Sequence, residues 1–204
     1  LLTVNSSDAV SGTCPIVITR TYTVTDPCGN FVNFIHRINV DDTQAPVVTG
    51  SLSTTTVEGC STGAAPPAAT TAAALEAMTG GITIADACTA DASLTVTHSD
   101  VANGTCPIVI TRTYTVTDAC GNSVTVNHTI NVDDTQAPVV TGSLSATTVE
   151  GCSVGAAPAA VGTIAAIEAL AGGITINDLC TADASLTVSH SDAVNGTCPI
   201  VITR

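Results

Sequence analysis

The 204-residue sequence is poor in aromatic and basic residues. It has no tryptophan, two tyrosines and two phenylalanines, and it carries four arginines and no lysine against 17 acidic residues. A core must therefore be built from aliphatic side chains, each worth roughly 1.5–3 kcal/mol when buried. The net charge of -13 at pH 7 argues against nucleic acids and anionic membranes as partners, because both would repel the chain.

Three further absences narrow the function. No apolar run reaches the ~18 residues that span a bilayer, so we expect no membrane insertion in this chain. None of the nine cysteines belongs to a Cys-x-x-Cys pair, which disfavours a structural zinc site. The sequence has no recognisable nucleophile–base pair or paired catalytic acids, and we expect no enzyme.

What the sequence does contain is a long internal repeat. The segment GTCPIVITRTYTVTDACGN at 104–122 occurs almost unchanged at 12–30, and its first nine residues return at 196–204. A period of 92 residues indicates tandem domains in a longer protein. We assign the C-terminal half of a repeat to 1–42, a complete repeat to 43–134 and the N-terminal part of the next to 135–204.

The repeated segment has the pattern of a β-hairpin. Over 123–132 apolar residues alternate with polar ones, which predicts a half-buried strand. Gly121-Asn122 is typical of the turn that would join this strand to the long strand before it. A short helix is expected over 72–78, and further strands over 47–58, 82–84 and 93–97.

About seven short strands per repeat indicate an all-β fold. We predict tandem immunoglobulin-like Greek-key β-sandwich repeats with a short helical insert, arranged as an extended array, because the strand order resembles the immunoglobulin-like scheme. Each repeat is small enough to benefit from covalent cross-links.

Four regularly placed cysteines per repeat indicate two disulfides, and hence an oxidising, extracellular setting. A continuous strand would hold Cys106 and Cys120 roughly 46 Å apart, whereas a disulfide needs Cα atoms within about 7 Å. The immunoglobulin-like order places one of them at each end of the sandwich. It predicts the pairs Cys60–Cys106, Cys88–Cys120 and Cys152–Cys198, with Cys60–Cys88 as the alternative. In this scheme the partners of Cys14, Cys28 and Cys180 lie outside the printed sequence.

Acidic residues gather where one repeat passes into the next. The sequence DDTQAP stands at 41–46 and again at 133–138, which indicates a defined junction rather than a flexible linker. Carboxylate and amide oxygens suit Ca²⁺, which takes about six to eight oxygen ligands. The candidate ligands are Asp41, Asp42, Asp86, Asp91, Asp118, Asn122, Asp133, Asp134 and Asp178. The alternative is that these residues cap turns by accepting backbone N–H groups.

Two other sets of residues have both a structural and a functional interpretation. His98 and His128 fall on apolar strand faces, and we interpret them as core or edge histidines rather than metal ligands. Four threonines line the outer face of the long strand: Thr111, Thr113, Thr115 and Thr117. Such a ladder is either a solvated face of good β-formers or a surface for binding ice or glycan.

Three motifs taken together, VITRTYTVTDACGN, INVDDTQAP and TTVEGC, resemble the HYR-like, immunoglobulin-like repeats of giant Bacteroidetes cell-surface proteins. Those proteins are similar to the mobile adhesins of gliding motility and are exported by the type IX secretion system. The resemblance covers the whole sequence and implies a cell-surface or filamentous stalk, without catalytic residues. Separately, DDTQAP resembles the calcium-binding linkers of cadherins.

We therefore expect a structural stalk of a bacterial cell-surface adhesin or filament, used for gliding or surface attachment. Its expected partners are neighbouring repeats of the same chain and other copies in a filament, and its expected cofactor is calcium. The alternative function is a glycan- or ice-binding module that uses the threonine-rich strand faces.

Overall fold

The computed structural model describes residues 1–197 and 199–204. Its contacts divide the chain into two compact units, each of which is described by itself. The first unit comprises Leu1–Val57 and Ser61–Val132, and the second comprises Glu58–Cys60 and Asp133–Arg204. The repeat boundaries expected after residues 42 and 134 stay a prediction.

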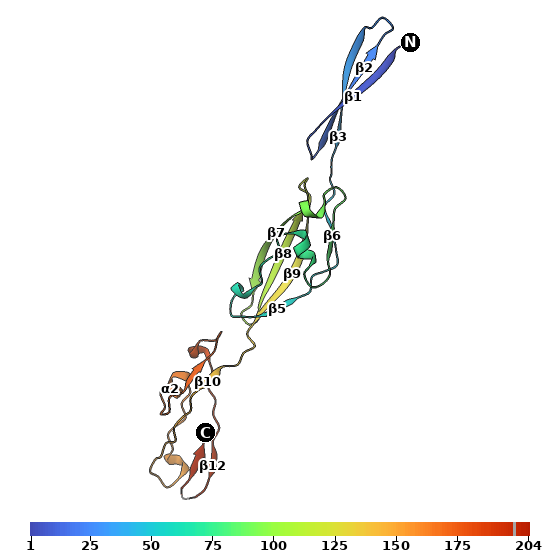
Figure 1. Ribbon diagram of the computed structural model, residues 1–204. Helices are drawn as coiled ribbons and strands as arrows, with labels where there is room; N and C mark the ends of the chain where they lie inside the picture. The colour runs from blue at the N-terminus through green and yellow to red at the C-terminus, as the bar shows by residue number, and fades with distance from the viewer. Residues whose placement is uncertain (198) are drawn as a thin grey trace. The chain divides into compact units, whose positions relative to one another are not determined.

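The first unit opens with a three-stranded antiparallel sheet, drawn in blue in Figure 1, in which β2 is the central strand. Its strands are β1 (Thr3–Ser11), β2 (Ile16–Thr25) and β3 (Phe31–Val40). The registers run from Thr3↔Thr25 to Ser11↔Val17 and from Ile16↔Val40 to Thr25↔Phe31. Long unbroken ladders of this kind follow from β-branched residues that alternate with polar ones.

The same three strands recur one repeat later with the same register. They are β7 (Thr95–Asn103), β8 (Ile108–Thr117) and β9 (Ser123–Asp133), and their pairing runs from Thr95↔Thr117 and from Ile108↔Val132. Here β5 (Thr55–Glu58) adds a fourth strand, in the order β5-β9-β8-β7. The hairpin predicted at Gly121-Asn122 is confirmed.

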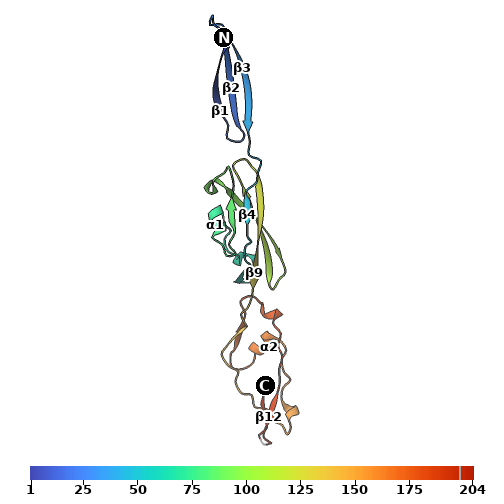
Figure 2. The same cartoon turned by 90° about the vertical axis from the view of Figure 1, so that its right-hand side faces the viewer.

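A second, smaller layer packs against this four-stranded sheet. It consists of β4 (Val47–Thr49) paired with β6 (Thr83–Ala85), together with α1 (Ala72–Glu76). The helix α1 contacts β6, and Figure 2 labels both α1 and β4. One buried cluster joins both layers through Leu75, Ile84, Val96, Tyr114 and Val116. Its interior is aliphatic except for Tyr114, as the composition requires.

A second cluster in the first unit contains Ile110, Ile130 and Val132, with Val57 packed against it.

The long strand is shorter than expected, because β8 covers only Ile108–Thr117. Cys106 and Cys120 therefore lie beyond its two ends.

The expected helix is present but ends two residues early. Thr71 caps α1, since its side-chain oxygen accepts a hydrogen bond from the Ala74 N–H at 3.1 Å. The chain leaves the helix through Gly80 and Gly81, whose φ angles of 121° and 71° favour glycine. Glu76 then accepts the Ile84 N–H at 2.7 Å, which ties the helix end to β6.

The second unit has short strands only. They are β10 (Val139–Thr141) paired with β11 (Thr175–Asn177) and β12 (Ala193–Asn195) paired with β13 (Val201–Thr203), and its helix is α2 (Ile164–Glu168). Its buried core contains Ile164, Ile174 and Ile176. The expected all-β class is confirmed, and no helix among the described residues is long and apolar enough to cross a membrane.

The disulfides are present, but their partners differ from those expected. Cys120 is bonded to Cys14, with Cα atoms 5.2 Å apart, and Cys60 is bonded to Cys180, with Cα atoms 4.9 Å apart. The predicted pairs Cys60–Cys106 and Cys88–Cys120 are therefore wrong, as is the alternative Cys60–Cys88. Of the pair Cys152–Cys198, Cys198 lies outside the described residues.

The prediction relied on the immunoglobulin-like order and paired cysteines within one copy of the repeat. Cys88 and Cys120 do follow the ends of β6 and β8. The sulfur that reaches Cys120 nevertheless comes from the preceding copy of the repeat, where Cys14 occupies the position equivalent to Cys106. The expectation that the partners of Cys14 and Cys180 lie outside the sequence is likewise wrong.

Candidate metal centre

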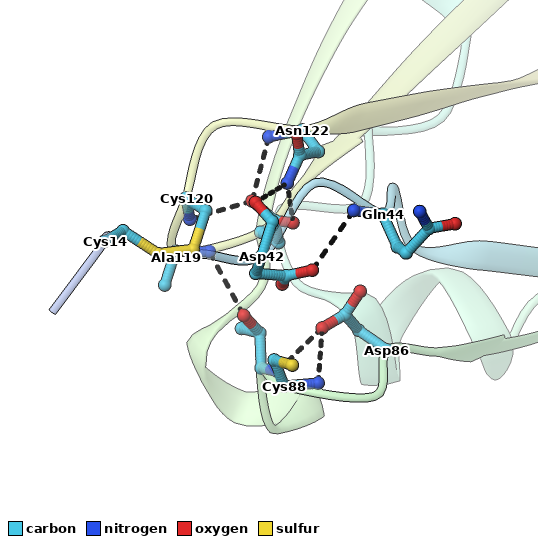
Figure 3. The surroundings of a disulfide bond; sticks show 10 residues. Cys14, Asp42, Gln44, Asp86, Cys88, Ala119, Cys120 and Asn122 are labelled. Atoms are coloured by element: carbon cyan, nitrogen blue, oxygen red, sulfur yellow. Dashed lines mark hydrogen bonds between the residues drawn. A yellow bond between two sulfur atoms is a disulfide. The ribbon is translucent and has the colours of Figure 1, made fainter. Parts of the chain in front are cut away.

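Three aspartates meet where three strands of the first unit end. Asp42 comes two residues after β3, Asp86 directly after β6 and Asp118 directly after β8. Figure 3 shows Asp42 and Asp86 near the Cys14–Cys120 disulfide. The side chains converge because the junction sequence brings Asp42 against the turns that follow β6 and β8.

The carboxylates lie close enough to share one cation. One oxygen from each of Asp42, Asp86 and Asp118 lies within 4.8 Å of the other two. Asp118 is 5% exposed, and Asp42 and Asp86 are half-buried. Three negative charges at such distances repel one another, and more strongly where water is partly excluded.

Each aspartate also accepts backbone N–H groups of a turn, which confirms the alternative interpretation that these residues cap turns. Asp118 Oδ1 accepts the N–H groups of Cys120 and Asn122, both at 2.8 Å. Asp86 Oδ1 accepts those of Cys88 and Thr89 at 2.9 and 2.7 Å. Asp42 Oδ1 accepts the N–H of Gln44 at 3.1 Å.

The second oxygen of Asp42 distinguishes this group from a set of ordinary turn caps. Asp42 Oδ2 is buried and has no hydrogen-bond partner among the described residues. A buried carboxylate oxygen without a partner is costly. A cation held between the three carboxylates would satisfy this atom and offset the repulsion.

Asn122 joins the group through two hydrogen bonds from its side-chain nitrogen. Nδ2 donates to Asp118 Oδ2 at 2.8 Å and to the backbone oxygen of Asp42 at 3.0 Å. The amide therefore fixes the Asp118 turn to the junction. Its nitrogen faces Asp118 and its role here is to position the carboxylate, which differs from the ligand role predicted for it.

The pKa of Asp118 reflects these contacts. Burial alone would raise the pKa, but hydrogen bonds from the Asn122 side chain and from the backbone N–H groups of the turn outweigh it, and the pKa lies below its usual value. Asp118 is therefore ionised at neutral pH, as a metal ligand must be.

The negative charge of the three aspartates also affects the thiol of the neighbouring Cys88. The pKa of Cys88 is raised, first by the negative charge of Asp42, then by burial, and then by Asp86 and Asp118. A shift with this cause reflects the negative charge that the three carboxylates place beside the thiol.

The remaining predicted ligands lie elsewhere. Asp41 and Asp91 are exposed and lie outside the group of three. Asp133, Asp134 and Asp178 belong to the second unit. There Asp134 Oδ1 accepts the Gln136 N–H at 3.1 Å and Asp178 Oδ1 accepts the Cys180 N–H at 3.0 Å, which repeats the capping seen at Asp42 and Asp86.

The junction into the second unit is held by a glutamate that the sequence analysis missed. Glu58 accepts the Thr135 N–H at 3.1 Å and the Thr135 hydroxyl at 2.6 Å, and the Gly59 N–H donates to the Asp133 oxygen at 3.0 Å. The pKa of Glu58 is lowered chiefly by the bond from the Thr135 side chain. The repeated pairing of TTVEGC with DDTQAP was the available signal.

An ion pair of the buried Arg112 with Asp100 was also missed. Arg112 is 5% exposed, and its Nε and Nη2 atoms donate to the two carboxylate oxygens of Asp100, both at 2.8 Å. Its Nη1 donates to the Pro66 backbone oxygen at 2.7 Å. The signal was in the alternation, since Arg112 falls on the same strand face as Ile110 and Tyr114.

The histidine interpretation fits the structure. His128 is 2% exposed, and its Nε2 lies 2.8 Å from the Thr55 hydroxyl. His98 is exposed on the edge strand β7. The four threonines of β8 are half-buried on the strand face opposite Tyr114. The Thr113 hydroxyl donates a hydrogen bond to Asn127 Oδ1 at 2.9 Å, so this threonine has a partner within the sheet.

No protein-family model matches the chain, and a comparison with curated proteins finds no match. Function is therefore argued from the cysteines, the junction and the acidic group. Chemically, this region can bind a hard cation through oxygen ligands and can link copies of the repeat through disulfides. The disulfides indicate an oxidising setting.

Proposed function

We propose that the chain is a load-bearing stalk of a bacterial cell-surface adhesin or filament, made of tandem immunoglobulin-like sandwich repeats. The observation that carries the proposal is that each disulfide joins cysteines of two successive copies of the repeat. The Cys60–Cys180 bond takes residues 61–179 out of the covalent path between the two ends of the chain. An enzyme or a free-standing binding domain has no need of this arrangement.

The junction supports the same function. Glu58 and Gly59 hold Thr135 and Asp133 through backbone and side-chain hydrogen bonds, and Asn122 holds the backbone of Asp42. Both copies of DDTQAP are thus bonded to folded parts of the chain. The resemblance to HYR-like repeats of Bacteroidetes surface proteins is consistent with this proposal and supplies the cell-surface location.

We also propose calcium as the cofactor of the stalk, bound by Asp42, Asp86 and Asp118. Oxygen-only ligands and a net negative site match the chemistry of Ca²⁺. The buried, unpartnered Oδ2 of Asp42 supports a cation at this position. The cation would fix the turns after β6 and β8 to the junction that follows β3.

Stretching a single molecule by its two ends tests the stalk. With both disulfides intact, the shortest covalent path runs through Cys60–Cys180 and contains 60 residues before it and 24 after it. Fully extended residues span at most about 3.5 Å each, so the oxidised chain should extend to about 300 Å and the reduced chain to about 700 Å. Equal extensions in both states would exclude a covalent load path.

A scattering experiment tests the array. Residues 113–204 amount to one full period, and appending them after Arg204 continues the repeat. A stalk should gain about 40 Å in maximum dimension per added copy, which is the length of about twelve residues of strand. A maximum dimension that grows only with the cube root of mass would contradict the proposal.

Calcium is tested by thermal unfolding with added Ca²⁺ and with a chelator. We expect Ca²⁺ to raise the melting temperature, and we expect Asp42→Asn to abolish the increase because it removes a ligand charge. Asp41→Asn is the matched control, since it removes the same charge from the exposed neighbouring residue. Identical melting of the unsubstituted chain in both solutions would remove the metal from the proposal.

A further inference from the structure

The two disulfides follow the same pattern when the position of each cysteine within the 92-residue repeat is compared. Cys120 is the equivalent, 92 residues later, of Cys28, and it bonds to Cys14 of the preceding copy. Cys180 is the equivalent of Cys88, and it bonds to Cys60 of the preceding copy. Among the described residues, both disulfides therefore join one class of cysteine to a different class in the following copy.

Two cysteines stand at positions equivalent to the two ends of the Cys60–Cys180 bridge, and neither of them is bonded. Cys88 stands where Cys180 stands, and Cys152 stands where Cys60 stands. Both are exposed free thiols. Cys152 is therefore equivalent to the bonded cysteine of the preceding copy, and Cys88 to the bonded cysteine of the following copy.

The backbone presents Cys88 and Cys180 in the same way. The N–H of Cys88 and that of Thr89 donate to Asp86 Oδ1 at 2.9 and 2.7 Å. The N–H groups of Cys180 and Thr181 donate to Asp178 Oδ1 at 3.0 and 2.6 Å. The unbonded cysteine thus sits in the turn that holds the bonded one.

The same holds for Cys60 and Cys152. Each is followed by an extended serine and a short 3₁₀ turn, and the serine has φ -154° and ψ 164° after Cys60 and φ -155° and ψ 165° after Cys152. Because the local geometry does not depend on whether the sulfur is bonded, both free thiols are preorganised for a bridge.

We propose that Cys88 and Cys152 are complementary cross-linking sites for further copies of the repeat: Cys152 bonds to the Cys88-type cysteine of a following copy, and Cys88 to the Cys152-type cysteine of a preceding one. This inference rests on the proposed tandem-repeat function. The partner copy belongs either to the same chain or to a second chain joined head to tail. Such a head-to-tail contact is heterologous, and it extends a linear assembly wherever its rotation does not close a ring.

The reaction is an oxidation of two thiols by a small disulfide such as oxidised glutathione. The first thiolate attacks one glutathione sulfur and displaces one glutathione thiolate, which gives a mixed disulfide. The second protein thiolate then attacks the protein sulfur of that mixed disulfide and displaces the other glutathione. Two protein thiols become one disulfide, and one oxidised glutathione becomes two reduced ones.

The two-chain case is tested with complementary variants in a Cys28→Ser background, which removes another exposed thiol. A Cys88→Ser variant keeps Cys152, and a Cys152→Ser variant keeps Cys88. Incubated separately with oxidised and reduced glutathione, each should remain monomeric on a non-reducing gel. Mixed, they should give a covalent dimer and nothing larger, whereas the parent with both cysteines should give a ladder.

Digestion after Arg, Asp and Glu identifies the bond, because it separates Cys88 from Cys106. Cys88 falls in the peptide 87–91 and Cys152 in the peptide 151–168, and the dimer should contain these two peptides linked. A dimer formed by either variant alone, or a linkage between two 151–168 peptides, would overturn the assignment.

The same-chain case uses the chain with residues 113–204 appended after Arg204, and with the exposed Leu179 changed to Val in the added copy as a mass label. We expect peptide 151–168 to be linked to the labelled peptide 179–183 of the added copy, which contains the equivalent of Cys180 and no other cysteine. A bond in either experiment supports the inference and names its source, and a bond in neither overturns it. If Cys14–Cys120 and Cys60–Cys180 are still found in that digest, the proposed stalk stands while this inference fails.

Discussion

The strands β2 and β8 have the same ten-residue sequence, IVITRTYTVT, and very different surroundings. Each is the centre of an antiparallel sheet with identical register. Tyr114 in β8 is fully buried, whereas Tyr22 in β2 is half-buried and stacks on Phe34, with ring centroids 5.2 Å apart. Phe34 is itself 52% exposed.

The difference is the second layer. Tyr114 lies under α1, β4 and β6, and its hydroxyl accepts the Ala69 N–H at 3.2 Å. Strand pairing and register therefore depend on the strand sequences themselves, while burial depends on the segment 43–94 that folds over them. The comparison teaches that these strands pair in the same register with or without a second layer over them.

The largest expected effect is at the tyrosines. Tyr114→Ala should lower the free energy of unfolding by about 3–5 kcal/mol, because it leaves a cavity and an unpaired Ala69 N–H. Tyr22→Ala should cost much less, since water already reaches that side chain. Hydrogen–deuterium exchange in β8 and β2 would measure both effects, and equal losses in the two variants would mean that the second layer does not determine stability.

The next effect concerns the bond between the two sheets. Cys14→Ser removes a bridge that closes 106 residues and should cost about 2–4 kcal/mol. We expect faster exchange in β1–β3, little change in β7–β9 and a newly reactive thiol at Cys120. Cys28→Ser is the control, because this exposed thiol forms no disulfide among the described residues. Protection of Cys120 from alkylation in the Cys14→Ser variant would contradict the assigned pairing.

A smaller difference is expected between the two ion pairs. The Arg112 side chain is 7% exposed in its pair with Asp100, whereas that of Arg20 is 35% exposed in its pair with Asp8. Asp100→Asn should cost about 1–3 kcal/mol, because it leaves a buried guanidinium without its counter-charge. Asp8→Asn should change stability less, since solvent screens that pair. Denaturant unfolding of both variants checks the ranking.

The smallest effect is the acid response of the same pair. The hydrogen bond from Arg112 is the main reason that the pKa of Asp100 lies below its usual value. A carboxyl whose pKa is lower folded than unfolded contributes stability above its unfolded pKa of about 3.9 and loses it as the pH falls through the folded pKa. Stability should therefore fall below about pH 4, and the fall should be shallower in Asp100→Asn. Parallel pH profiles would show that this pair is not responsible.

Much of the acidic site could be predicted from the sequence. Asp42, Asp86 and Asp118 were all expected at one end of the sandwich, because each follows a strand and chain direction places those strand ends together. Asp41 was expected there too and is not, since successive residues of an extended segment point in opposite directions. Asp91 also lies outside the group, because it belongs to a 3₁₀ turn farther along the chain. The cap at Asp118 was also predictable from its Cys-Gly-Asn turn.

The sequence by itself determined the repeat, the alternation that pairs β8 with β9, and the need for an aliphatic core. Only the tertiary structure decided which cysteines bond, and that Arg112 is buried with Asp100 and Pro66. Strand pairing is local and has a period that can be read along the chain. Disulfide partners depend on which copy of the repeat brings a second cysteine close to the first, and four cysteine positions that recur in successive copies leave that choice open until the chain is folded.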